Sequence, residues 1–521
     1  MTIFSTSKPR TGYEEDVLPG TDILRDRGSN ERTSYCRSFL LSPDWDSDAN
    51  SNLVPRPSDA PHDPLNWSPT WKYLVIATQF LFLFVSVESA LSMGPMFPFF
   101  AEEFHLDETQ LSLLTGACVL ALGYSNFLIV PCSNIFGRRI TSLAFCLLGT
   151  ASCLWQALAK SHSSLLVARV VNGIATATSE TVMVQVTSDI FFLHERGAWT
   201  GLYFMGYFLG LFIGPIISGN IAQNIGWRSF FWLSLAMSAF NFITLLVVFP
   251  ETRYLRDHKD APASSTQPSS TEPIKQELTH LENLETPQWK QLLLRDLTVP
   301  FYAFLFPIIL WAGLNVAGPA NLLLYWNLTE SGVLSAPPYN FSPSSVGYSN
   351  FAFVAGGLVG LVTAGPFSDW IAARATARNG GIREAEMRLP ALIPYFITTV
   401  VGVIIGGLGY DRQWEWPVII VVGYGLTGLC VTAVPTIAIS YAVDCYEPIS
   451  GEIMVVATVI KNTCGFVMSY WVMPMAARRG WLVPTMVEFS LTIGPLLFGI
   501  PMYFFGKSLR QLTRNSRVHA L

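Results

Sequence analysis

Charged residues are scarce in this chain. They make up 13% of its 521 residues, whereas soluble globular proteins contain about 25%. This scarcity argues against a soluble fold, and the 50% share of hydrophobic residues argues against disorder of the whole chain. The net charge of −5 is small for this length and gives no support for binding to nucleic acid. The composition therefore predicts a membrane protein.

Paired cysteine spacings, metal-ligand clusters and nucleophile–base motifs are missing as well. The eight cysteines fall mostly in apolar runs without a Cys-X-X-Cys spacing, which indicates buried thiols rather than disulfides or zinc ligands. Gly506-Lys507-Ser508 looks like the end of a nucleotide-binding loop, but Pro501 stands where that loop requires a glycine. We therefore expect neither an enzyme nor an ATP-driven pump, and no cofactor or metal.

Long apolar runs are what the sequence contains instead. Each is about 20 residues long, the length of a helix that crosses a hydrocarbon core of about 30 Å. Twelve such runs begin near residues 72, 109, 140, 163, 198, 227, 298, 345, 390, 416, 452 and 484. Their continuous apolar character favours helices over barrel strands. The predicted fold class is all-α, with twelve transmembrane helices in two pseudo-symmetric six-helix bundles.

A polar segment divides these runs six and six. The predicted parts are a disordered cytosolic tail (1–70), an N-terminal six-helix bundle (71–250), a cytosolic linker (251–297), a C-terminal six-helix bundle (298–508) and a cytosolic tail (509–521). The linker includes a low-complexity stretch at 261–273. The first 70 residues contain no apolar signal segment, so we expect the first span to direct membrane insertion.

The basic residues indicate that both ends face the cytosol. With the N-terminus inside, cytosolic segments contain 25 of the 32 Lys and Arg residues and outer loops contain five. The sequons at Asn327 and Asn340 then fall in the longest predicted external loop, so both are candidate N-glycosylation sites, the second weakened by Pro343. We expect a multi-pass protein of the plasma membrane, or alternatively of the vacuolar membrane.

Matching turns follow the second and eighth spans. Asn134-Ile-Phe-Gly-Arg-Arg139 follows span two, and Gly365-Pro-Phe-Ser-Asp369 with the nearby Arg374 follows span eight. An amide or acid followed by arginine therefore recurs at the same place in each half. Internal repeats of this kind are typical of secondary transporters.

Several further motifs point to one family. They are Asp63-Pro-Leu-Asn-Trp67, Arg169-Val-Val-Asn-Gly173, Pro250-Glu-Thr-Arg253, Pro338-Tyr-Asn-Phe341, Gly381-Ile-Arg-Glu384, Tyr441-Ala-Val-Asp444 and the Gly/Pro run of span five. With these and the Asn134–Arg139 loop, the chain resembles the major facilitator superfamily between about residues 60 and 508, and within it the fungal branch of the 12-spanner drug:proton antiporter family. The resemblance implies a secondary transporter of a small organic molecule.

The resemblance also implies a cytosolic gate and a flexing seal. The gate residues are Asn134, Gly137, Arg138 and Arg139, with Asp369 in the second half. Asn134 replaces the family's acid, so we expect a weaker clamp, because an amide forms no ion pair; alternatively, the arginines only set topology. In span five, Gly210, Gly214 and Pro215 match the family's antiporter motif, with Ser218 in place of a glycine. Generic close packing explains the glycines equally well.

Ionisable residues within the spans are candidates for the mechanism, because a charge at the bilayer centre costs about 2.5–3.5 kcal/mol even on a lenient scale. Glu88 and Arg169 both fall in the outer third, where an ion pair is sterically plausible, and Arg169 coincides with the family arginine associated with proton transfer. Glu180 follows Arg169 on the same helix face, about 16 Å deeper. Glu88 or Glu180 is therefore a candidate coupling or substrate acid, with a structural role as the alternative.

The second half adds further polar residues. Lys461 lies mid-span, where it either repels protons or pairs with an acid across a cavity. Asn315 in span seven is suited to contact an organic ligand. Glu488 is expected at the outer membrane surface.

We therefore predict a proton-driven antiporter that exports a drug, toxin or secondary metabolite. The alternative is proton-coupled uptake of organic cations such as polyamines. The expected partners are the organic substrate, protons and the bilayer, the proton gradient is the energy source, and a monomer suffices. A substrate-sensing receptor is disfavoured by the short C-terminal tail.

Overall fold

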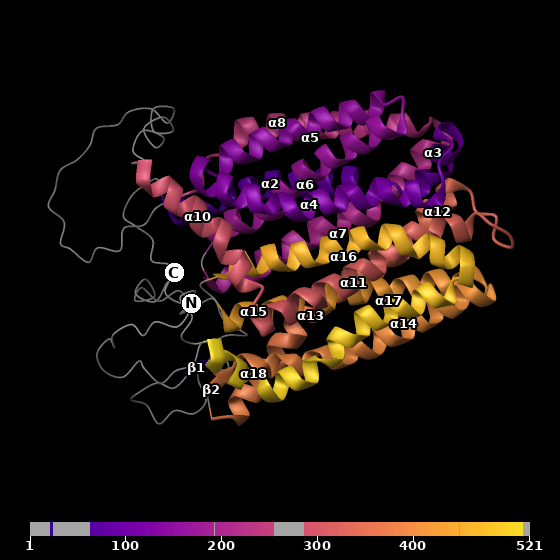
Figure 1. The fold of residues 1–521 in the computed structure, drawn as a ribbon. Helices are drawn as coiled ribbons and strands as arrows, with labels where there is room; N and C mark the ends of the chain where they lie inside the picture. The colour runs from indigo at the N-terminus through magenta and orange to yellow at the C-terminus, as the bar shows by residue number, and fades with distance from the viewer. Residues whose placement is uncertain are drawn as a thin grey trace, which may run out of the picture.

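The computed structural model describes residues 21–23, 63–191, 193–254, 286–380, 382–446 and 449–513. Most of the predicted N-terminal tail, the low-complexity part of the linker and the last eight residues (514–521) lie outside the described residues. The described chain is almost entirely helical, with two groups of long, roughly parallel helices stacked on one another (Figure 1).

The N-terminal group begins after the short turn η2 (Pro64–Asn66). Its elements are α2 (Pro69–Leu91), η3 (Gly94–Met96), α3 (Phe97–Phe104), α4 (Glu108–Phe136), α5 (Arg138–Leu158), α6 (His162–Ile190), α7 (Leu193–Asn224) and α8 (Trp227–Val248). Local sequence sets several of these bounds. Asp107 and Gln110 form a capping box at the start of α4, and Ser161 accepts a hydrogen bond from the backbone N–H of Ser164 in the first turn of α6.

The C-terminal group repeats the pattern. Its elements are α10 (Thr286–Ala303), α11 (Pro307–Leu334), α12 (Pro343–Ser349), α13 (Phe351–Arg378), η4 (Ala385–Ala391), α14 (Leu392–Arg412), the π-helical η5 (Val418–Tyr424), α15 (Gly425–Cys445), α16 (Ser450–Arg479), α17 (Leu482–Leu497) and α18 (Gly499–Thr513). The two groups have their own apolar cores and meet mainly where α4 contacts α16 and where α7 contacts α12 and α13.

Ten helical segments of the described chain are long and apolar enough to cross a membrane, and the α17–α18 pair, bent by 42°, makes eleven. The twelfth long helix, α6, has 29 residues and lies against α4, α5 and α2, but Arg169, Glu180 and many hydroxyl groups make it too polar for this test. The all-α fold with two helical bundles is confirmed. The predicted count of twelve spans is reached only if the polar α6 is included.

Span seven lies later in the sequence than predicted. The apolar run near 298 contains Pro300, and the chain breaks between α10 and α11, so that the long apolar helix extends from Pro307 to Leu334. This shift places residues expected in an external loop inside a helix.

A short antiparallel pairing connects the N-terminal part of the described chain to a loop of the second bundle. It lies at the end of the molecule that the sequence predicts to face the cytosol, called the cytosolic end below. Strand β1 (Thr21–Ile23) pairs with β2 (Ile382–Glu384), with Asp22 opposite Arg383. A segment of the predicted N-terminal tail therefore lies against the loop between α13 and η4 (Figure 1).

Candidate transport pathway and gates

A cavity lies between the two bundles near the middle of the helices. Its accessible volume is about 40 Å³, and it is bounded by α7 on one side and by α11, α15 and α16 on the other. Its lining residues are Tyr203, Tyr207, Phe208, Val316, Ala320, Val431, Pro435, Ile439, Met454, Ala457, Thr458 and Lys461. The walls are apolar and aromatic except for the phenols, one threonine and the ammonium group, which is the usual composition of a site for an organic ligand.

Glu180 and Lys461 meet beside this cavity. The Lys461 Nζ lies 3.8 Å from the Glu180 Oε2, donates a hydrogen bond to the Tyr207 hydroxyl at 3.0 Å and lies 4.7 Å from the Tyr207 ring centroid. Glu180 is 4% exposed. The predicted pairing of Lys461 with an acid across the cavity is therefore present. It joins α6 of the first bundle to α16 of the second.

Arg169 and Glu88 do not form the predicted ion pair in this conformation. The buried Arg169 guanidinium donates hydrogen bonds to the backbone carbonyls of Ser89, Ala90 and Leu114 and to the Gln156 side chain. Glu88 is also buried but instead accepts a hydrogen bond from the Ser234 hydroxyl at 3.3 Å. The physical reason is that α2 presents its carbonyl groups, rather than the Glu88 side chain, to α6.

Two residues of the C-terminal bundle lie elsewhere than predicted. Asn315 is buried against α17, where its amide donates to the carbonyls of Trp311 and Pro495, and it is not part of the cavity lining. Glu488 is fully buried within the bundle rather than at the membrane surface. Both errors arise because hydropathy places a residue along a helix but not around it.

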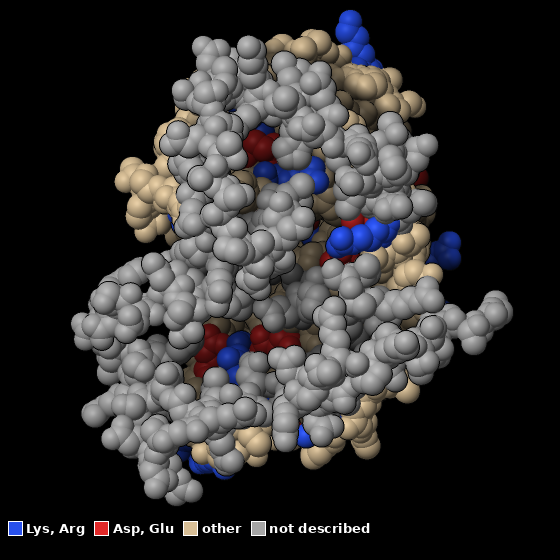
Figure 2. Space-filling model, turned by 90° about the vertical axis from the view of Figure 1, so that its left-hand side faces the viewer, with Lys and Arg blue, Asp and Glu red and all other residues tan. Residues whose placement is uncertain are grey.

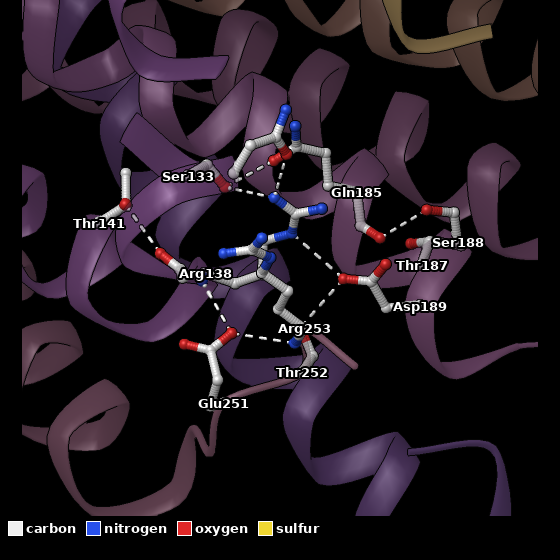
Figure 3. Close-up of polar contacts among 12 residues, drawn as sticks. Ser133, Arg138, Thr141, Gln185, Thr187, Ser188, Asp189, Glu251, Thr252 and Arg253 are labelled. Atoms are coloured by element: carbon white, nitrogen blue, oxygen red, sulfur yellow. Dashed lines mark hydrogen bonds and ion pairs between the residues drawn. The ribbon is translucent and has the colours of Figure 1, made fainter. Parts of the chain in front are cut away.

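Arg138 is the centre of the cytosolic cluster in the first bundle (Figure 3). Its guanidinium donates to the Asn134 side chain at 2.7 Å and to the Ser133 hydroxyl at 3.0 Å, and it pairs with Asp189 at 3.2 Å. Asp189 lies at the end of α6, so Arg138 joins the ends of α4 and α6. The sequence analysis named Arg138 as a gate residue but did not identify Asp189 as its acidic partner.

Glu251 completes this cluster from the segment after α8. Its carboxylate accepts hydrogen bonds from the backbone N–H groups of Arg138 and Arg139 at the start of α5, where a negative charge is favoured. Gly137 precedes them with φ +94°, and a Cβ at this position would lie 2.2 Å from the Glu251 carboxylate. Glycine is therefore required at 137. Burial, together with repulsion from Arg138, lowers the pKa of the neighbouring Arg253.

Asn134 has a second partner that the sequence did not indicate. While its Oδ1 accepts from Arg138, its Nδ2 donates to Asp296 of α10 at 2.5 Å. Asp296 is 5% exposed, and α10 contacts both α4 and α16. An amide can serve an arginine and a carboxylate at the same time, whereas an acid at 134 would repel Asp296. The amide therefore links α4 to α10, which also contacts α16 of the other bundle, and is more than a weaker clamp.

The C-terminal bundle carries a related cluster around Arg388. Its guanidinium pairs with Asp369 at the cytosolic part of α13 at 2.8 Å and with Asp444 near the end of α15 at 2.5 Å. Arg374, which the sequence repeat suggested, instead lies over the Trp370 ring. Both clusters therefore have the same three parts. In the first bundle they are Asn134 after span two, Arg138 at the start of span three and Asp189 at the end of span four. In the second bundle they are Asp369, Arg388 and Asp444 after span eight, before span nine and at the end of span ten. Figure 2 shows acidic and basic residues gathered on this end of the molecule.

The small residues of span five contact two different neighbours. A Cβ on Gly210 would lie 2.8 Å from the Phe84 carbonyl oxygen, and one on Gly214 would lie 1.8 Å from the Ser92 hydroxyl, so both glycines allow close packing against α2. The Pro215 carbonyl instead faces Gly347 of α12 in the other bundle.

The outer ends of the bundles are sealed by α7 and α12. The Gln223 side chain accepts from the Ser344 backbone N–H at 2.9 Å, and the Tyr348 hydroxyl donates to Asn220 at 2.6 Å. Close by, the buried Glu330 of α11 accepts two contacts from the Asn350 side chain. The sequence analysis missed Glu330 because it placed this residue outside the membrane spans.

The two sequons have different environments. Asn327 lies within α11 and is 5% exposed, so its side chain has no space for a glycan in this conformation. Asn340 lies in the exposed segment between α11 and α12. Its glycosylation remains a prediction.

Two bundles of membrane helices around a buried polar pair define a class of protein, the secondary transporters. The chain belongs to the Major Facilitator Superfamily, whose sequence profile matches residues 74–469. Similar proteins include an uncharacterized MFS-type transporter of Schizosaccharomyces pombe (27% identical, covering 96% of this chain and 94% of that protein), Protein HOL1 of Saccharomyces cerevisiae (26%, 96% and 96%) and Efflux pump vrtL of Penicillium aethiopicum (26%, 90% and 92%).

Solved structures with the same fold include the human organic anion transporter MFSD10 (TM-score 0.56, 16% identical, covering 83% of this chain and 100% of that chain). Another is the proton:xylose symporter XylE (TM-score 0.58, 14% identical, 86% and 100%). At these identities the likeness establishes the fold alone. Membership of the superfamily makes this protein a multi-pass membrane transporter rather than an enzyme.

Proposed function

We propose that this protein exports a small organic molecule in exchange for protons. The observation that carries the proposal is the Glu180–Lys461 pair beside the cavity between the bundles. A carboxylate in this position can be neutralised by a proton, by the Lys461 ammonium or by a cationic group on a substrate. Because these three compete for one site, occupancy by a proton releases a bound cation. Competition of this kind favours exchange over cotransport.

Desolvation makes this competition effective. An isolated charge buried beside an apolar cavity is costly, so neither Glu180 nor Lys461 is stable alone in its ionised form. When a substrate cation or a proton binds to Glu180, Lys461 loses its ion pair. The Tyr207 hydroxyl and ring then remain in contact with the Lys461 ammonium group. Because the partner of Lys461 changes, the inward-open and outward-open conformations differ in relative stability between the proton-bound and the substrate-bound protein.

The other predicted residues have supporting roles in this proposal. Arg169 fixes the backbone of α2 next to Glu88, so proton exchange at Glu88 would accompany movement of α2 against α6. The clusters around Arg138 and Arg388 act as cytosolic gates, and Gly210, Gly214 and Pro215 let α7 flex. The protein would work as a monomer in the plasma membrane, without a cofactor.

The test uses the purified chain in proteoliposomes with an imposed pH gradient, and ethidium as the first probe. We expect the wild type to move ethidium against the direction of proton flow. Glu180→Gln should reduce gradient-driven transport at least about tenfold, the effect of removing roughly 1.4 kcal/mol of coupling. Exchange of ethidium for ethidium without a pH gradient should persist. Glu102→Gln, the same substitution at an exposed glutamate away from the cavity and the gates, serves as the matched control. Full gradient-driven transport by Glu180→Gln would contradict the assignment.

Uptake of organic cations is the second candidate, and one observation favours it. Glu180 and the Tyr207 ring and hydroxyl already hold a primary ammonium group, that of Lys461. A substrate amine could take the same place, since cations bind well over aromatic faces. Labelled spermidine accumulation in deletion and overexpression cells separates the directions. Faster accumulation with more transporter would replace export by uptake.

A further inference from the structure

We propose that Glu330 is a proton-binding site that controls the outer seal between the two bundles. The carboxyl group would be protonated when the seal is closed and would lose its proton to the external medium when the seal opens. The inference depends on the alternating access proposed above but not on the role of Glu180.

Glu330 lies four residues before the end of α11 and is fully buried. Its two carboxyl oxygens lie 3.3 and 3.2 Å from the Asn350 Nδ2. The titratable groups that face it are the phenols of Tyr410 on α14 and Tyr424 on η5. Within the described part of the chain, no lysine, arginine or histidine forms an ion pair with Glu330. Its charge therefore has no counter-ion in this conformation.

The carboxyl group lies where the two bundles touch. Gly94, between α2 and α3 of the first bundle, approaches it so closely that a Cβ on Gly94 would lie 3.3 Å from the Glu330 Oε1. The same Cβ would lie 2.7 Å from the backbone oxygen of Asn327. Opening the outer side must separate these surfaces and admit water to Glu330.

Asn350 connects Glu330 to the rest of the seal. It stands at the junction of α12 and α13, and α12 is the helix that contacts α7 of the first bundle through Ser344 and Tyr348. The hydrogen bond from Asn350 therefore ties the position of α12 to the buried carboxyl group. A change at Glu330 reaches the contact between the bundles through one short helix.

The charge state of Glu330 and the state of the seal are therefore linked. A carboxylate in this dry contact would lack both water and a cation, which disfavours ionisation. Water restores the hydration of the ionised form once the seal opens. Protonation consequently favours closure and deprotonation favours opening, so the open population rises with external pH, by up to about tenfold per pH unit for one linked proton. Glu88, at the matching place in span one, faces Ser234 within its own bundle and lacks this link.

The experiment measures opening directly, without a substrate. Spin labels are attached to cysteines introduced at Asn224 and Ala336, two exposed positions on opposite sides of the seal. Their distance distribution is recorded for the full chain in lipid nanodiscs between about pH 5.5 and about pH 8.5. The parent protein without the added cysteines reports any labelling of native thiols. We expect the long-distance population of the wild type to grow with pH.

Two variants make the result specific. Glu330→Gln keeps an acceptor for Asn350 but cannot ionise, so its seal should stay closed across the whole pH range. Glu488→Gln removes another buried carboxyl of the same bundle, on α17, which packs against α11, α14 and α16. This variant should keep the wild-type pH dependence. The proposal is overturned if the wild type shows no pH dependence, or if Glu330→Gln opens like the wild type. Since Glu180 is intact in both variants, either result leaves the exchange proposal standing.

Discussion

In the first bundle, Asn134 at the end of span two donates a hydrogen bond to Asp296 of α10, a helix that also contacts α16 of the other bundle. In the second bundle, Asp369 stands at the matching place, but its side chain is 63% exposed and pairs with Arg388 of its own bundle. The same repeat therefore forms an inter-bundle contact at the cytosolic end in only one of its two copies. An amide suits that place because its partners have opposite charges.

The outer ends show the reverse relation. Glu88 and Glu330 both lie near the outer end of the first span of their bundle, and both are buried. Glu88 contacts its own bundle, whereas Glu330 lies against Gly94 of the other one. Of these two pairs of matching positions, Asn134 of the first bundle and Glu330 of the second make the contacts that reach beyond their own bundle. The pseudo-symmetric repeat places residues at matching positions in the two bundles. The type of residue at each position then determines whether it contacts the other bundle.

The largest effects should come from replacing the arginines of the two clusters. They test whether Arg388, rather than Arg374, is the counterpart of Arg138 in the second bundle. Arg138→Ala leaves Asp189 without its guanidinium and should lower the stability of the protein by about 3 kcal/mol. Arg388→Ala should cost less, about 2 kcal/mol, because Arg383 also reaches Asp444. Arg374→Ala, an exposed residue, should change stability by no more than about 0.5 kcal/mol. Thermal unfolding in detergent measures all three, and a loss for Arg374→Ala as large as that for Arg388→Ala would refute the assigned pairing.

A smaller effect should come from replacing the amide of the first cluster by an acid, and the acid at the matching place in the second cluster by an amide. Asn134→Asp places a second carboxylate beside Asp296 and should weaken the α4–α10 contact by about 1–2 kcal/mol. Hydrogen exchange in α10 should then become about tenfold faster or more. Asp369→Asn should leave α10 unchanged.

The double variant Asn134→Asp with Asp296→Asn reverses the donor and the acceptor. It should restore slow exchange in α10, because the amide and the carboxylate are again paired. If the double variant exchanges as fast as Asn134→Asp alone, the link between the bundles does not depend on this contact.

The smallest effect concerns the two sequons near the outer end of the second bundle. Asn340 is exposed and Asn327 is buried. For protein expressed in yeast, we expect glycosidase treatment to increase gel mobility for the wild type and for Asn327→Gln but not for Asn340→Gln. A mobility change that disappears only with Asn327→Gln would contradict the placement of α11.

The sequence predicted the features that depend on composition and local order. Apolar runs identified the helices, and the loop from Asn134 to Arg139 identified one cytosolic cluster. Pairing with an acid was one of two alternatives predicted for Lys461, and the structure places it 3.8 Å from Glu180. The resemblance to the family supplied the arrangement of the two bundles.

The sequence could not predict contacts that depend on rotation and long-range packing. Asp189, Glu251 and Asp296 lie far along the chain from Arg138 and Asn134, and no local pattern brings them together. Burial of Glu488 and the turn of Asn315 toward α17 depend on the rotation of their helices. Glu330 and Asn327 were misplaced because polar residues at the end of α11 hide the helix from a hydropathy count.

The central claim is that one carboxyl group, that of Glu180, binds either a proton or the cationic substrate. The most direct test measures proton release when ethidium binds to the purified protein in a weakly buffered solution, alongside calorimetric binding of the same probe. The account predicts release of up to about one proton per bound ethidium for the wild type and none for Glu180→Gln. Equal proton release by Glu180→Gln, with ethidium still bound, would contradict it.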